Sequence, residues 1–103
     1  MASLTREETY RFTHKLYQLL FNHSDHIFIR KLHQDVHGEY DPSTEDIHID
    51  FRRDLISTLI HEAFHHWHPN WCETKVLEME SKVVNSLSQR QVKNVIKALA
   101  NVL

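Results

Sequence analysis

The sequence predicts an α+β domain in which helices surround a small three-stranded sheet. Apolar residues recur at helical spacing near the N-terminus and throughout the second half of the chain, which favours helices there. Residues 26–50 instead hold short alternating or β-branched runs, which favour strands. At 103 residues the chain is long enough for one modest core. We therefore expect a single domain over residues 1–103, with a C-terminal tail over 88–103.

The first element is a helix over residues 5–22. Thr5 can cap it, and Glu7 and Glu8 place acidic groups in its first turn. Its apolar residues fall on one stripe, which predicts the buried face: Phe12, Leu16, Leu19 and Leu20.

Three strands are expected next. Residues 26–32 are rich in β-branched and aromatic side chains. Gly38–Asp41 forms a second short strand, and residues 42–45 have the composition of a turn. Residues 46–50 alternate polar and apolar side chains, as a half-exposed strand does.

A central helix is expected from about Phe51 to Trp67. Asp50 can cap its start, and Pro69 ends it because the residue before a proline resists helical geometry. Its apolar back is wide: Leu55, Ile56, Leu59, Ile60, Ala63, Phe64 and Trp67.

The opposite face of this helix carries the motif His61-Glu62-Ala63-Phe64-His65, an HExxH sequence. Residues four apart lie on one face of a helix, so His61 and His65 can bind the same metal ion. Glu62 lies at the border of that face, where it can act as a general base. The motif predicts a zinc hydrolase.

A third metal ligand is expected from the helix over residues 73–87, which returns after Pro69. Its apolar stripe consists of Val76, Leu77, Val83, Val84 and Leu87.

Three glutamates of this return helix are candidates for that ligand. Glu80 falls at the centre of the stripe, where a carboxylate needs positive charge to compensate its burial. Glu78 lies on the side of the helix away from the stripe, beside Lys75 and Lys82, and is expected to be a solvent-exposed surface residue. Glu73 lies in the first turn, where acidic residues favour the helix dipole. We predict Glu80 as the ligand and keep Glu73 as the alternative.

Composition excludes several other classes of function. The formal net charge of -2 gives no electrostatic argument for binding nucleic acid or an anionic membrane. The single Cys72 excludes an internal disulfide and suits a reducing compartment. No signal-peptide or transmembrane pattern is present. We expect a cytoplasmic protein.

Residues 59–69, the compact return helix and the chain length resemble the minigluzincins. These are minimal soluble relatives of the catalytic domains of integral-membrane gluzincins such as CaaX prenyl proteases. The resemblance implies a zincin-like fold and a zinc-dependent peptidase acting on a peptide or protein. His61, His65 and Glu80 would hold Zn²⁺, with Glu62 as the general base. Strand 46–50 would offer the peptide a free edge.

The chain departs from the family at one position. The family often has an acidic residue four positions after the ligand glutamate, where it supports a zinc-bound histidine. Here that position holds Val84, counting from Glu80, or Leu77, counting from Glu73. The residue that would stabilise the oxyanion is also unassigned, and Tyr40, His37 and His48 remain open candidates.

The alternative function is a catalytically inactive, metal-binding interaction module on the same scaffold. A pure metal scaffold needs the two histidines but not Glu62, so Glu62 favours an enzyme. The amphipathic tail over 88–103 can pack as a helix, and it suggests two further hypotheses. It covers the cleft, so that the full chain is latent like a zymogen, or it mediates self-association.

Overall fold

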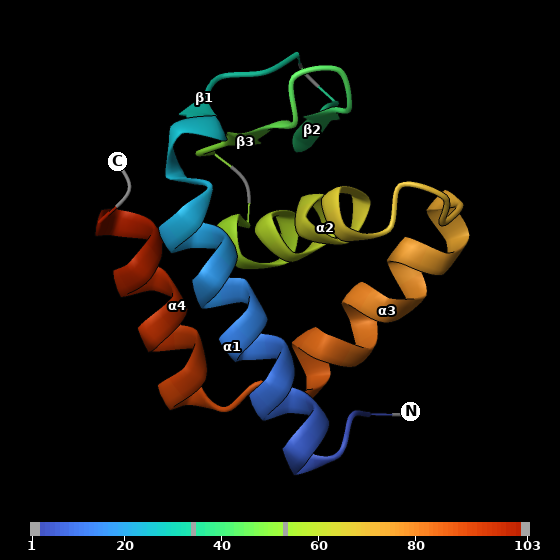
Figure 1. Cartoon of the computed structure of the whole chain (residues 1–103), viewed down its shortest axis with the longest axis vertical. Helices are drawn as coiled ribbons and strands as arrows, with labels where there is room; N and C mark the ends of the chain where they lie inside the picture. The colour runs from blue at the N-terminus through green and yellow to red at the C-terminus, as the bar shows by residue number, and fades with distance from the viewer. Residues whose placement is uncertain (1–2, 34, 53, 102–103) are drawn as a thin grey trace.

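The computed structural model describes residues 3–33, 35–52 and 54–101. Within this part of the chain, four α-helices, one 3₁₀ helix and three strands follow one another, and the predicted α+β class is confirmed. In chain order they are α1 (Arg6–Asn22), η1 (Ser24–His26), β1 (Ile27–Arg30), β2 (Gly38–Asp41), β3 (Asp46–Asp50), α2 (Leu55–Trp67), α3 (Glu73–Ser86) and α4 (Gln89–Asn101) (Figure 1).

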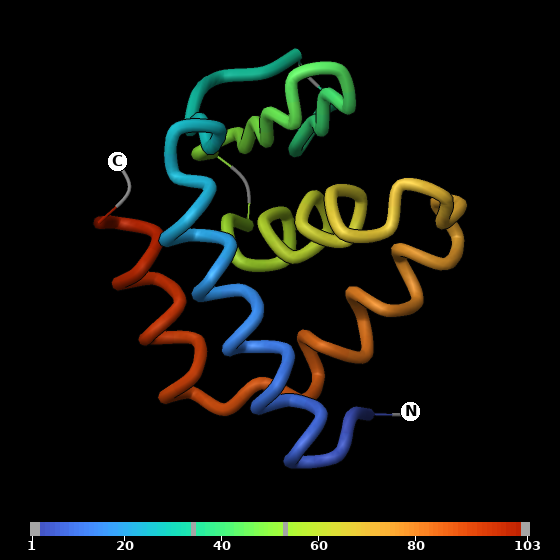
Figure 2. Tube along the Cα trace, in the orientation of Figure 1, coloured from blue at the N-terminus to red at the C-terminus, as the bar shows by residue number. Residues whose placement is uncertain are grey.

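Helix α2 lies at the centre of the molecule. The sheet covers one side of it, and α1, α3 and α4 contact it from the other sides. Helix α3 leaves the end of α2 and diverges from it, so that the two helices form an open V (Figure 2). Each described helix is too short or too polar to traverse a lipid bilayer.

The sheet has the order β1-β3-β2, with β1 parallel and β2 antiparallel to β3. Residues 46–50 therefore form the central strand, and the expectation that they present a free edge is wrong. Both edges of β3 are paired, because Ile47 and Ile49 each have a partner in β1 and another in β2. The edge strand on the α2 side is β2, which contacts α2 directly.

The hydrogen-bonding register leaves two residues of β2 with free backbone groups. The Asp50 N–H donates to the His37 carbonyl at 2.9 Å, in the register that also pairs Gly38 with Ile49. Bonded and non-bonded pairs alternate in antiparallel ladders. The backbone N–H and C=O groups of Gly38 and Tyr40 therefore face away from β3.

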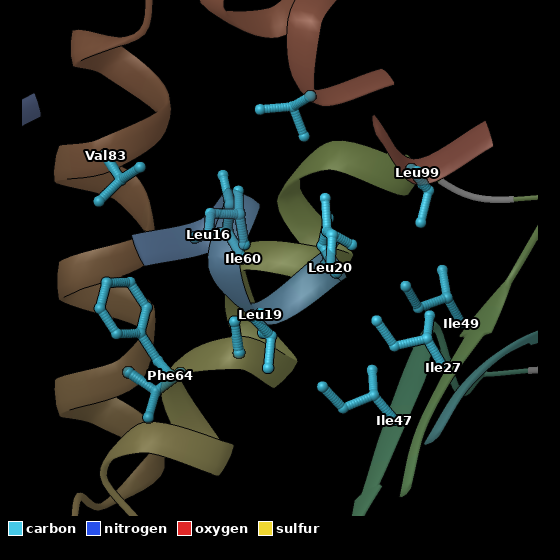
Figure 3. Packing of buried hydrophobic residues seen from close by; sticks show 14 residues of the cluster. Leu16, Leu19, Leu20, Ile27, Ile47, Ile49, Ile60, Phe64, Val83 and Leu99 are labelled. Carbon is cyan, nitrogen blue, oxygen red and sulfur yellow. The ribbon is translucent and has the colours of Figure 1, made fainter. Parts of the chain in front are cut away.

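The core lies between the sheet, α1 and the helices of the second half. Ile27, Ile47 and Ile49 face it from the sheet, and Leu19 and Leu20 from α1 (Figure 3). The remaining buried apolar residues of the cluster are Leu16, Leu59, Ile60, Ala63, Phe64, Val76, Val83, Val95 and Leu99. Burial of this apolar surface supplies most of the driving force for folding.

The predicted cap of the first helix is confirmed. The Glu8 N–H donates to Thr5 Oγ1 at 3.1 Å, and the Thr5 N–H donates to Glu8 Oε1 at 2.9 Å. This reciprocal capping box satisfies backbone donors that a helix start otherwise leaves unpaired.

The predicted cap of the central helix is wrong. Asp54 caps α2, with its carboxylate accepting the N–H groups of Ile56 and Ser57 at 3.0 and 3.2 Å. Asp50 still belongs to β3, because the chain needs further residues to turn from the strand into the helix. Its buried carboxylate pairs with Arg52 at 2.7 Å and accepts the Leu32 N–H at 3.0 Å. Asp50 thus ties the β1–β2 connection to the end of β3.

The apolar stripe of the return helix is narrower than predicted. Val76 and Val83 are buried, whereas the side chains of Leu77 and Val84 are 51% and 40% exposed. The divergence of α3 from α2 explains the difference, since splayed helices share only a narrow strip of contact. Leu77 instead lines one of the cavities beside the HExxH motif.

The described part of the tail forms a helix that contributes to the core, so the prediction that it packs as a helix is confirmed there. Helix α4 packs against α1 and buries Val95 and Leu99. Val102 and Leu103 of the predicted tail lie outside the described residues.

Candidate metal centre

Helix α2 presents His61 and His65 on the face that points toward β2 and α3. One helical turn separates them, and their Nε2 atoms lie 3.2 Å apart. Both side chains are partly buried. The spacing in the sequence therefore places two imidazole nitrogens at one point, as predicted.

The third group at this point comes from the first turn of α3. The carboxylate of Glu73 spans both rings, with Oε1 2.7 Å from His61 Nε2 and Oε2 3.0 Å from His65 Nε2. One ligand atom from each of His61, His65 and Glu73 lies within 4.8 Å of the others, so these three residues could hold a metal ion. The structure thus brings the alternative candidate, Glu73, to the histidines.

Glu80, the preferred candidate from the sequence, contacts the other nitrogen of the same ring. Its Oε1 lies 2.8 Å from His61 Nδ1. The two nitrogens of an imidazole point in different directions, so one histidine can face a metal site with Nε2 and a second carboxylate with Nδ1. The expected register, with residue 80 opposite His61, is present. Glu80 is nevertheless outside the group of three ligand atoms.

This donor set suits a divalent transition metal. Two imidazoles and one carboxylate are the ligands of many catalytic zinc sites, and tetrahedral zinc needs donor atoms about 3.3 Å apart. The observed separations of 2.7, 3.0 and 3.2 Å require the side chains to part by a few tenths of an ångström. A proton on His61 Nδ1, donated to Glu80, leaves the Nε2 lone pair free for a metal.

Glu62 lies beside this group and is almost completely buried. Its side chain is 5% exposed. Burial raises the pKa of Glu62 to about 7, and the nearby carboxylates of Glu73, Glu39 and Glu80 add to the rise while His61 opposes it.

Gly38 makes room for Glu62. A Cβ atom at Gly38 would lie 2.7 Å from Thr58 Cγ2 and 2.9 Å from Glu62 Oε2. Because no side chain separates them, β2 lies directly on α2 at the turn that carries the motif. Only glycine allows this close approach.

Two cavities flank the group and share Gly38, His61, Glu62 and Glu73 among their lining residues. The first, of about 500 Å³, includes Tyr40, and we call it the Tyr40 cavity. The second, of about 450 Å³, includes Leu77, and we call it the Leu77 cavity. Together they form a cleft that follows the free edge of β2 on both sides of the histidines.

Comparisons with protein-family models, curated proteins and solved structures found no match. The chemistry of the site is therefore inferred from its own donor atoms, burial and charge.

Three residues are candidates for the unassigned oxyanion group, and two of them line the cleft. Tyr40 lines the Tyr40 cavity, and its hydroxyl lies 3.1 Å from His66 Nδ1. His37 lines the Leu77 cavity. His48 lies elsewhere, stacked on Phe28 and accepting a hydrogen bond from Arg30 Nε at 3.0 Å. Of these three, Tyr40 and His37 line the cleft and His48 does not.

The described part of the tail does not cover the cleft. No residue between 88 and 101 lines either cavity. Helix α4 instead lies along α1, away from α3 and the motif (Figure 1). The expectation that the tail covers the cleft is therefore wrong for its described residues.

Proposed function

We propose that this protein is a zinc-dependent metallopeptidase of the gluzincin type, on a minimal zincin-like fold. The observation that carries the proposal is the convergence of His61, His65 and Glu73 beside the buried carboxylate of Glu62. Helix α3 supplies a glutamate to the two histidines of α2, as the resemblance to minigluzincins implies. The ligand glutamate in this proposal is Glu73.

Glu80 takes the role of the missing supporting carboxylate. It lies seven positions after Glu73, so both glutamates project from one face of α3, two turns apart. Glu73 reaches the Nε2 side of His61 and Glu80 the Nδ1 side. A carboxylate on the second nitrogen fixes the tautomer and the ring orientation of a metal-binding histidine. With Glu73 as the ligand, the family's supporting acid would stand at Leu77. In this chain Glu80, about one helical turn after Leu77, supplies that carboxylate instead.

A bound zinc ion would supply Lewis acidity, both to water and to the carbonyl of a peptide bond. Glu62 would accept the proton of the attacking water and pass it to the leaving amine. Its burial suits this role, because a carboxylate in a poorly hydrated pocket has a higher affinity for protons than one in water. Gly38 leaves the space that Glu62 occupies on the side of β2.

The edge of β2 would bind the substrate. The free N–H and C=O groups of Gly38 and Tyr40 can hydrogen-bond an extended peptide, which would add a fourth strand to the sheet. Such a strand would run along the cleft and pass over the motif.

The inactive metal-binding module is the competing function. It requires His61, His65 and Glu73 but has no use for a buried carboxylate beside them. Leaving Glu62 uncompensated in the interior lowers stability, since burial penalises its charged form. A peptidase accounts for this arrangement and a scaffold does not.

Hydrolysis of a mixed peptide library by zinc-loaded protein tests the proposal. Wild type should cleave peptides, and Glu62→Gln should lower the rate by about 10²–10⁴-fold, the usual contribution of a general base. Glu78→Gln, on the exposed side of α3, is the matched control and should cleave at the wild-type rate. Stoichiometric zinc in Glu62→Gln would show that the site is intact. Equal cleavage by wild type and Glu62→Gln would refute the proposed mechanism.

A further inference from the structure

The cleft has an excess of negative charge that the proposed metal does not use. Five carboxylates line the two cavities: Asp35, Glu39, Glu62, Glu73 and Glu80. No lysine or arginine lines either cavity in the described part of the chain.

A divalent ion leaves part of this charge unbalanced. Two positive charges on the metal would balance Glu73 and Glu80, and Glu62 has its own role as a base. Asp35 in the Leu77 cavity and Glu39 in the Tyr40 cavity remain, one on each side of the histidines. A cleft lined by one sign of charge attracts ligands of the other sign.

The Leu77 cavity is lined by apolar side chains as well as by the carboxylate of Asp35. Leu77 is a half-exposed leucine between Glu73 and Glu80 of α3, and the partly buried Val36, just before β2, lines the same cavity. Ser57 and Thr58 of α2 contribute small side chains to the lining. Asp35 is exposed, so its carboxylate remains hydrated until a ligand approaches it.

Lysine and arginine fit this combination better than other side chains. Their aliphatic stems cover apolar surface while the charged end stays at a polar boundary. A leucine side chain of a bound peptide would pack on Leu77 and Val36 but would leave Asp35 without an ion-pair partner. A glutamate would face Asp35 and the other carboxylates of the cleft, and like charges brought together cost free energy.

We propose that the Leu77 cavity selects a lysine or arginine side chain of the bound peptide. The aliphatic stem lies on Leu77 and Val36, and the cationic end pairs with Asp35. This inference rests on the proposed function for the placement of the peptide along β2. It adds the substrate class, namely peptides with a basic residue next to the bond over the motif.

Peptide binding to zinc-loaded Glu62→Gln protein tests the inference without turnover. Three fluorescent peptides of equal length differ at one position, which holds lysine, leucine or glutamate, and fluorescence anisotropy gives the affinities. The lysine peptide should bind about tenfold more tightly than the leucine peptide and more tightly still than the glutamate peptide. Asp35→Lys, added to this protein, should remove the preference for lysine.

Glu78→Lys is the matched control for Asp35→Lys. It changes the net charge by the same amount as Asp35→Lys. Glu78 lies on α3, is exposed, and its carboxylate is 3.7 Å from Lys82 Nζ. It should leave the preference for lysine unchanged. Equal affinities for the lysine and leucine peptides, no detectable binding of any peptide, or the same loss in both charge variants would overturn the inference.

Hydrolysis by the wild-type protein separates the two proposals. Cleavage that depends on zinc and Glu62 but shows no preference for basic residues would leave the peptidase standing and remove the inference. A preference for the lysine peptide in binding, with no cleavage of any peptide, would remove the peptidase and keep the recognition.

Discussion

Glu80 Oε1 lies 2.8 Å from His61 Nδ1, while Glu73 Oε1 lies 2.7 Å from His61 Nε2. One imidazole is thus held between two carboxylates of the same helix. The two contacts support different proposed roles for the glutamates, because only Nε2 faces the neighbouring histidine. Glu73 is the proposed ligand and Glu80 the positioning residue.

Glu80→Gln should therefore weaken zinc binding without abolishing it. Loss of a carboxylate behind a metal-bound histidine typically lowers metal affinity by about 10–100-fold. Competition with a chromophoric chelator would measure the change, with Glu78→Gln as the control. Unchanged affinity in Glu80→Gln would mean that the contact with His61 does not support the site.

Gly38→Ala should impair both folding and catalysis. The added methyl would overlap Thr58 Cγ2 and Glu62 Oε2, and overpacking of this kind destabilises a protein by about 1–3 kcal/mol. Thermal unfolding and peptidase rates would measure the two effects. Adding Thr58→Ser removes the methyl at 2.7 Å, so it should restore part of the stability but not the rate. Full recovery of the rate in the double variant would contradict the contact with Glu62.

Leu99→Ala should destabilise the chain and leave the cleft as accessible as before. Truncating a buried leucine costs about 2–5 kcal/mol, whereas Ile96→Ala on the same helix, at a residue 51% exposed, should cost about 0.5 kcal/mol or less. Chemical denaturation gives both values. If α4 restrained the enzyme, Leu99→Ala would instead raise the peptidase rate of the folded protein, and the latency hypothesis would return.

Asp50 should make stability depend on acid pH. The Arg52 guanidinium, with the backbone N–H groups of Arg52 and Leu32, holds the pKa of Asp50 well below its usual range. The folded state thus favours the ionised form. This contribution is complete above the unfolded-state pKa of about 3.9 and is lost as the pH falls toward the lower pKa of the folded state.

Asp50→Asn tests this dependence. The variant should melt below wild type at pH 7, and the difference in Tm should shrink as the pH falls below about 4. Asp25→Asn, at an exposed aspartate of η1, is the control and should follow the wild-type profile. A difference in Tm that stays constant down to pH 2.5 would contradict the assignment to Asp50.

Several features of single helices and strands are predicted correctly, because they depend only on residues close in the sequence. The capping box at Thr5, the alternation in residues 46–50 and the four-residue spacing of His61 and His65 each depend on neighbours in sequence. The prediction that Asp50 caps α2 is wrong, because two aspartates in the same short segment can both cap a helix and tertiary contacts decide between them. Asp50 is taken by Arg52 and Leu32, which leaves Asp54 for the helix.

Features that depend on the arrangement of elements could not be read from the chain. The alternation of polar and apolar residues does not distinguish a central strand from an edge strand, so it does not predict the central position of β3. The ligand choice depended on the angle between α2 and α3, which sets how far each glutamate reaches. One signal was available in the sequence. Glu73 and Glu80 are seven residues apart and share one face of the helix, which indicates that both can reach the same histidine.

The most direct test of the metal centre is the zinc content of reloaded protein, measured by native mass spectrometry. Wild type and the control Glu78→Ala should each hold one zinc ion per chain, and Glu73→Ala should hold none after passage over a weak chelator. Stoichiometric zinc in Glu73→Ala, or none in wild type, would contradict a centre formed by His61, His65 and Glu73.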